Sequence, residues 1–186
     1  SILFDMTRKI HLFLLLALMF LPALTACRPA SAIAHGETLQ LATATENYVE
    51  VSIGLRRGEN DTYTLTATFT PLEAGLHLYS KDIPVTGVDG LGRPTLLTLP
   101  ADSALTQVAE TLESQSSQDP FEGPSELRVY PEGPITLSIP VLLPEGQDWL
   151  DQQVLVTYMA CNERGCRAPV ESKAIDIRIP SLGLIQ

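Results

Sequence analysis

Two cysteines lie five positions apart near the C-terminal end of the sequence. Cys161 and Cys166 fall between two segments of strand-forming residues, 153–158 and 174–179. Segments joined by so short a connection form a β-hairpin, in which directly opposed residues have Cα atoms about 4.5–5.5 Å apart. A disulfide requires a separation in this range. The spacing therefore predicts two thiols that can be joined and separated with little backbone movement.

Three kinds of site could use such a pair. A structural bridge here would close a loop of about six residues and contribute only about 2 kcal/mol, against nearly 5 kcal/mol for a loop of about a hundred residues. A metal site needs further ligands, which the neighbouring sequence does not offer, and binding of copper or another soft metal by two thiolates is a weaker alternative. A redox-active pair is the favoured interpretation, and it requires an exported, oxidising compartment.

The N-terminal segment has the features of an export signal. Arg8 and Lys9 precede an apolar stretch, 10–24, that is shorter than a typical membrane-spanning helix. The stretch ends in Leu24-Thr25-Ala26-Cys27, which resembles the lipobox of bacterial lipoproteins. We expect residues 1–26 to be a lipoprotein signal peptide and Cys27 to carry the lipid that anchors the chain to a membrane. The alternative is an ordinary signal peptide with a chance cysteine.

Composition limits the remaining possibilities. The formal net charge of −10 argues against nucleic acid and anionic headgroups as partners. Residues 27–45 are rich in Ala, Thr and Pro without a sustained period, so we expect a lipidated N-terminus and a flexible tether. Residues 46–182 remain as one domain, which is long enough to bury a core.

The domain has the pattern of an all-β protein. Apolar residues alternate with polar ones at Val49, Val51, Ile53 and Leu55, which is the period of a half-buried strand. Fourteen prolines and twelve glycines punctuate a series of short segments of this kind, which predicts a β-sandwich. We expect strands at 48–56, 63–69, 76–79, 95–99, 127–130, 135–143, 154–158 and 174–179, and either a strand or a helix at 105–112.

Four ordered segments together resemble the family of N-terminal periplasmic domains of the thiol:disulfide interchange protein DsbD. The best match is the closing segment, in which Val156-Thr157-Tyr158 is followed by Cys161, Cys166 and Pro169. Residues 119–123 resemble the cap loop of that family. Residues 75–81 resemble its strand that ends in an aromatic residue beside the site, and 134–141 a further strand. Order and approximate spacing hold from about residue 46 to residue 180.

The resemblance implies an immunoglobulin-like β-sandwich with the cysteine pair on a hairpin at one end. It also implies a component of a protein-disulfide oxidoreductase that uses no cofactor. Such a domain accepts electrons from a thioredoxin-like donor and passes them to disulfide-bearing envelope proteins, in processes such as cytochrome c biogenesis. By position, Cys166 would form the mixed disulfide with a partner and Cys161 would resolve it. The sequence ends at Gln186 without the membrane helices that follow in that family, so we expect electrons to come from separate proteins.

The resemblance also assigns roles around the cysteines. Phe121 would be the cap residue that covers the pair until a partner displaces the loop. Asp119 and Glu122, on the same loop, would raise the pKa of a nearby thiol by like-charge repulsion. The positive charges of Arg164 and Arg167 would act in the opposite direction. Tyr79 and Tyr158 would shape the site, and His77 is a candidate proton acceptor near the sulfurs.

A binding module is the alternative from a different functional class. It would be an immunoglobulin-like lipoprotein in which the Cys161–Cys166 bridge is permanently oxidised and the surface docks another envelope protein. The two hypotheses differ in the reduction potential of the pair. Exchange proteins lie between about −180 and −270 mV, whereas stable structural bridges lie below about −300 mV.

Overall fold

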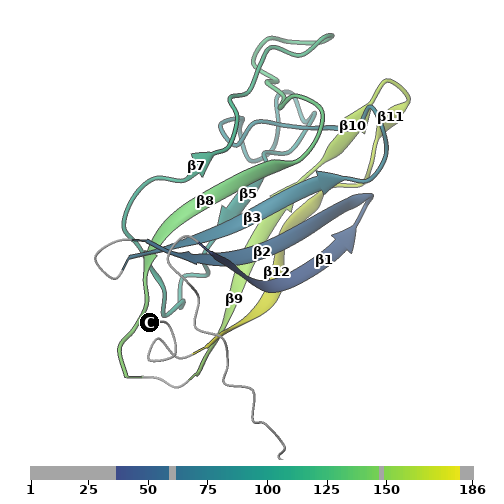
Figure 1. The fold of residues 1–186 in the computed structure, drawn as a ribbon. Coiled ribbons are helices and arrows are strands. Elements are labelled where there is room, and N and C mark those ends of the chain that lie inside the picture. The colour runs from purple at the N-terminus through teal and green to yellow at the C-terminus, as the bar shows by residue number, and fades with distance from the viewer. Residues whose placement is uncertain (1–36, 59–61, 147–148, 181–186) are drawn as a thin grey trace, which may run out of the picture. The chain divides into compact units, whose positions relative to one another are not determined.

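The structure, a computed structural model, describes residues 37–58, 62–146 and 149–180. All regular elements in this part of the chain are β-strands (Figure 1). No helix capable of crossing a membrane occurs among these residues. The strands are β1 (Thr38–Glu46), β2 (Val49–Arg57), β3 (Tyr63–Pro71), β4 (His77–Leu78), β5 (Leu96–Thr98), β6 (Thr106–Gln107), β7 (Leu112–Glu113), β8 (Ile135–Leu142), β9 (Trp149–Tyr158), β10 (Ala160–Asn162), β11 (Gly165–Cys166) and β12 (Val170–Pro180).

The largest sheet is antiparallel and has the order β1-β2-β3-β8-β6, with β7 also paired to β8. Its central strands alternate strictly between buried and partly exposed residues, so one face is turned to the core. Cross-strand pairs on that face are large and apolar, as where Phe69 lies opposite both Val51 and Ile135. The alternation that predicted these strands therefore also fixes their register.

A second sheet, β12-β9-β5, completes the sandwich. Val154 and Val156 of β9 and Ile177 of β12 join Leu65 and Leu137 of the large sheet in one hydrophobic core. The all-β sandwich of immunoglobulin-like type expected from the sequence is thus confirmed. Its two layers share a single apolar interior.

A third, small sheet has the order β11-β10-β4 and lies at one end of the sandwich (Figure 1). β10 begins two residues after β9 ends, so the chain passes directly from the second sheet into the small one. β12 returns to pair with β9, with an irregularity in register between Val170 and Lys173. The two cysteines are therefore carried at the end of the pair formed by the two longest strands.

The predicted tether was wrong in its second half, because β1 begins at Thr38. β1 pairs with β2 along its whole length, but its register shifts between Gln40 and Ala42. Such a bulge changes the phase of the inward-facing residues, and the strand consists mostly of Thr and Ala. For these reasons no period was visible in the sequence. The expected signal peptide, Cys27 and the first part of the tether, to residue 36, lie outside the described residues.

Two further segments differ from expectation. Residues 127–130 were predicted as a strand, but they make only isolated bridges, from Val129 to Tyr79 and to Gln118. The ambiguous segment 105–112 contributes two short strands, β6 and the start of β7, at the edge of the large sheet. Residues 105–112 therefore contain strand but no helix, with β6 and β7 both paired to β8.

Candidate functional site

The two faces of the small sheet have different surroundings. Successive residues of a strand point to opposite faces. Leu78 and Ala160 accordingly join the main core, whereas Tyr79 and Cys161 belong to a second, smaller hydrophobic cluster. That cluster also contains Ile83, Leu127 and Val129. The alternation therefore places the cysteines outside the main core, on the outer face of the small sheet.

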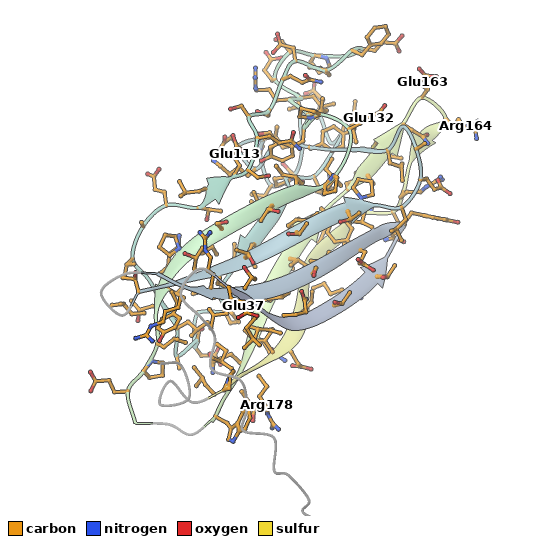
Figure 2. The ribbon with its side chains drawn as sticks, in the orientation of Figure 1. Glu37, Glu113, Glu132, Glu163, Arg164 and Arg178 are labelled. Atoms are coloured by element: carbon orange, nitrogen blue, oxygen red, sulfur yellow. A yellow bond between two sulfur atoms is a disulfide. The ribbon has the colours of Figure 1, made fainter. Side chains whose placement is uncertain are left out.

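Cys161 and Cys166 are directly opposed in the β10–β11 hairpin and form a disulfide. Their Cα atoms are 4.0 Å apart. Asn162 and Gly165 close the hairpin, and the Asn162 Oδ1 atom accepts a hydrogen bond from the backbone N–H of Arg164. Figure 2 shows Glu163 and Arg164 at the hairpin tip. The sequence predicted opposed cysteines on a hairpin, and the structure has this arrangement as a short hairpin at the end of β9 and β12.

The two cysteines differ in accessibility. Cys161 is 3% exposed and packs in the small cluster, whereas Cys166 is exposed on β11. β11 is an edge strand, so its far side has no strand partner among the described residues. Cys166 is thus the more accessible of the two residues. The roles that the resemblance assigned to the two cysteines remain predictions.

Tyr79 contacts the disulfide through its hydroxyl. Its hydroxyl donates a hydrogen bond to Cys161 Sγ at 3.0 Å and lies 3.9 Å from Cys166 Sγ. Burial raises the pKa of Tyr79, so the phenol keeps its proton and remains a donor. Tyr79 thus contacts the sulfur atoms of the pair. Its expected role in shaping the site remains a prediction.

The backbone around Tyr79 holds its side chain in place. The carbonyl of Tyr79 accepts hydrogen bonds from the backbone N–H and the hydroxyl of Thr95. Gly92, at φ 73°, lies against the ring, and an added Cβ would be 3.1 Å from Tyr79 Cε1 and 2.9 Å from Leu127 Cδ1. A glycine is needed here because the backbone is left-handed and the ring occupies the space.

His77 lies opposite Cys161 in the pairing of β4 with β10. Its ring meets the Tyr79 ring edge to face, with centroids 5.6 Å apart. Burial lowers the pKa of His77, and the negative charge of Glu132 opposes this shift in part. The small sheet thus carries Cys166, Cys161 and His77 side by side on three adjacent strands.

The predicted cap does not cover the disulfide in this structure. Phe121 is 97% exposed and Glu122 is also exposed. At the base of the loop, Gln118 and Val129 exchange two backbone hydrogen bonds. The Asp119 carboxylate is engaged by Arg128 at 2.7 Å. These contacts hold the stem of the loop, whereas the Phe121 side chain at its tip points into solvent.

Tyr158 belongs to the main core rather than to the immediate surroundings of the sulfurs. Its ring packs edge to face on Phe69, and its hydroxyl donates to the backbone carbonyl of Glu46 at 3.0 Å. Burial is the main cause that raises the pKa of Tyr158 to about 12. As the last residue of β9, Tyr158 anchors the point from which the cysteine segment leaves the sandwich.

The apolar residues that pack around Cys161 were not expected from the sequence. Ile83, Leu127 and Val129 form the apolar wall of the small cluster. Arg167, next to Cys166, pairs with Glu73 at 2.5 Å and stacks over the ring of Tyr48. The alternation of Leu127 and Val129 was a usable signal, whereas the pairing of Arg167 with Glu73 is long-range. Within the described residues, no group of three His, Cys, Asp or Glu side chains is arranged to hold a metal ion.

Comparisons with known proteins give one finding. No protein-family model matches the chain, and no curated protein sequence matches it. Among solved structures, the N-terminal domain of DsbD from Neisseria meningitidis, crystallised in the reduced form, is similar to this chain. The alignment has a TM-score of 0.42 and 18% identity, and it covers 77% of this chain and 86% of that one.

Proposed function

We propose that the protein is a thiol:disulfide exchange domain that works through reversible reduction of the Cys161–Cys166 disulfide. The observation that carries the proposal is the asymmetry of the pair. Cys166 is exposed on an edge strand, whereas Cys161 is buried and accepts a hydrogen bond from Tyr79. Exchange needs one accessible sulfur and one sulfur that leaves as a stabilised thiolate. A bridge whose purpose is only structural needs neither.

In the first step, a thiolate of the partner attacks Cys166 Sγ. A bond forms between the partner sulfur and Cys166, and the bond between the two cysteine sulfurs breaks. The electron pair of the broken bond goes to Cys161, which leaves as a thiolate. The Tyr79 hydroxyl, 3.0 Å from this sulfur, donates a hydrogen bond to the developing charge.

In the second step, the other thiolate of a dithiol partner attacks its own sulfur in the mixed disulfide. Cys166 is released as a thiolate, the partner becomes a disulfide, and this domain has gained two electrons. The reverse sequence passes the electrons on. The Cys166 thiolate attacks the disulfide of an acceptor, and Cys161 then resolves the mixed disulfide.

The partners we propose are a thioredoxin-like donor and disulfide-bearing envelope proteins. An exported protein anchored through lipid on Cys27 would meet both in the compartment where disulfides persist. A cap role for Phe121 remains a prediction. In this proposal, the exposed position described above is the open arrangement of the loop.

The proposal is tested by the reduction potential of the pair. The oxidised chain is equilibrated with a thioredoxin-like dithiol of known potential, and free thiols are trapped and counted. We expect a value between about −180 and −270 mV. A value below about −300 mV would contradict the exchange function and favour the binding module with a permanent bridge.

Two single-cysteine variants provide a matched comparison. Cys161→Ser leaves the exposed Cys166 thiol, which should trap a disulfide-bearing partner as a stable mixed disulfide. Cys166→Ser leaves the buried Cys161 thiol, which should trap little. Equal trapping by both variants would contradict the proposed division of roles.

A further inference from the structure

His77 faces the cysteine that leaves during exchange. In an antiparallel pair, directly opposed residues project from the same face with Cβ atoms about 4.5–5.5 Å apart. Cys161 pairs with Cys166 on one side and with His77 on the other. The imidazole is therefore next to Cys161 and one strand further from Cys166. The contact of its ring with Tyr79 fixes this position from a second direction.

We propose that His77 makes exchange at the Cys161–Cys166 disulfide depend on pH, because a protonated imidazole opposite Cys161 stabilises the thiolate that leaves when Cys166 is attacked. This inference rests on the proposed function and adds to it a second group, beside Tyr79, that acts on the leaving sulfur. No proton is transferred in the step. His77 already carries the proton, and its positive charge offsets the negative charge that appears on Cys161.

The surroundings of His77 set the pH at which its imidazole becomes protonated. Burial disfavours the charged imidazole, so its pKa lies below the ordinary value of 6.5. Glu132, on the turn after Tyr130 and labelled in Figure 2, acts in the opposite direction. The pKa of Tyr79 is raised, so the phenol is neutral throughout the acidic range.

Other charged groups lie on the segments next to β4 and β10, and the turn between β10 and β11 carries Glu163 and Arg164. The loop before β4 carries Glu73, which is paired with Arg167 from the segment after β11. On β10 and β11, the described residues near His77 are the disulfide itself and the uncharged Asn162 and Gly165. His77 is the only histidine among the described residues.

The size of the effect follows from simple electrostatics. An opposite charge within about 4–6 Å lowers the pKa of a group by about one unit or more. If about half of the charge has developed on the leaving sulfur in the transition state, the rate of attack rises about threefold or more when His77 is protonated. Exchange should therefore be faster on the acidic side, once the rate is expressed per attacking thiolate.

The test is the pH profile of the reaction of the oxidised chain with 2-mercaptoethanol, followed by trapping and corrected for the thiolate fraction of the reagent. The unmodified chain should show a rise of about threefold or more toward acidic pH, with a midpoint below 6.5. His77→Phe keeps an aromatic ring against Tyr79 but cannot be charged, and His77→Gln keeps a polar side chain. Both variants should give a flat profile. Glu132→Gln should keep the rise but move its midpoint to lower pH.

Three outcomes would overturn the inference. They are a flat profile in the unmodified chain, the same rise in both His77 variants, and a midpoint that Glu132→Gln leaves in place or moves upward. In each of these cases the disulfide still exchanges, so the proposed function stands. If the unmodified chain does not react with the thiol at any pH, the proposed function fails together with the inference.

Discussion

Replacing Tyr79 by Phe removes the hydroxyl that donates to Cys161 Sγ while keeping the ring that fills the small cluster. A hydrogen bond to a charged group contributes about 1.5–3 kcal/mol. Its loss should raise the pKa of the Cys161 thiol in the reduced protein by about one to two units, since one unit corresponds to 1.36 kcal/mol. With about half of the charge developed in the transition state, attack on Cys166 should become about three to ten times slower.

The assay is the reaction of the oxidised chain with a monothiol, measured by trapping at a fixed pH. It is accompanied by titration of the reduced chain with an alkylating reagent. Tyr130→Phe is the matched control, because this second buried tyrosine donates to Glu113 at 2.7 Å, away from the sulfurs. The control should reduce the free energy of unfolding without changing the rate. If Tyr79→Phe leaves both the rate and the thiol pKa unchanged, the hydrogen bond has no part in exchange and the mechanism is refuted.

Three further predictions concern the same end of the domain and its core. Gly92→Ala should lower the free energy of unfolding by at least about 2 kcal/mol, because it adds a Cβ against Leu127 and Tyr79 at a left-handed position. A urea titration that shows no loss of stability would contradict the packing described. Phe121→Ala should change that free energy by less than about 0.5 kcal/mol, because the side chain is 97% exposed. The cap role predicts a faster reaction with small thiols in this variant, and an unchanged rate would contradict that role. Stability should fall as pH rises from 10 to about 12, because the folded protein keeps the Tyr158 phenol protonated while the unfolded chain releases its proton; Tyr158→Phe should lose part of this dependence in unfolding titrations at several pH values.

The strands predicted well from the sequence are those in which apolar side chains on the buried face alternate with polar side chains on the other face. β3 and β8 are buried on one face along their whole length, so the apolar period and the structure coincide. β1 was missed because its register shift changes the phase and its Thr and Ala side chains carry little signal. Leu39, Leu41, Ala42 and Ala44 pack against the main core but are only partly buried, so the strand has no clear apolar period.

The candidate site was predictable where the information is local. The spacing of Cys161 and Cys166 was enough to oppose them on a hairpin. The hydrogen bond from Tyr79 joins residues 82 positions apart, so it required the three-dimensional arrangement. The position of Phe121 also depends on distant contacts, because the stem of its loop is held by the Asp119–Arg128 pair and by the bonds between Gln118 and Val129.

The small cluster around Cys161 is separate from the main core of the sandwich. Substitutions among the large residues of the main core would therefore change the free energy of unfolding without changing the residues that surround the sulfurs. Changes at Ile83, Leu127 or Val129 would alter the surroundings of the sulfurs, and because these side chains are buried they would change stability as well. The stability of the domain can thus be changed through the main core while the surroundings of the disulfide are kept.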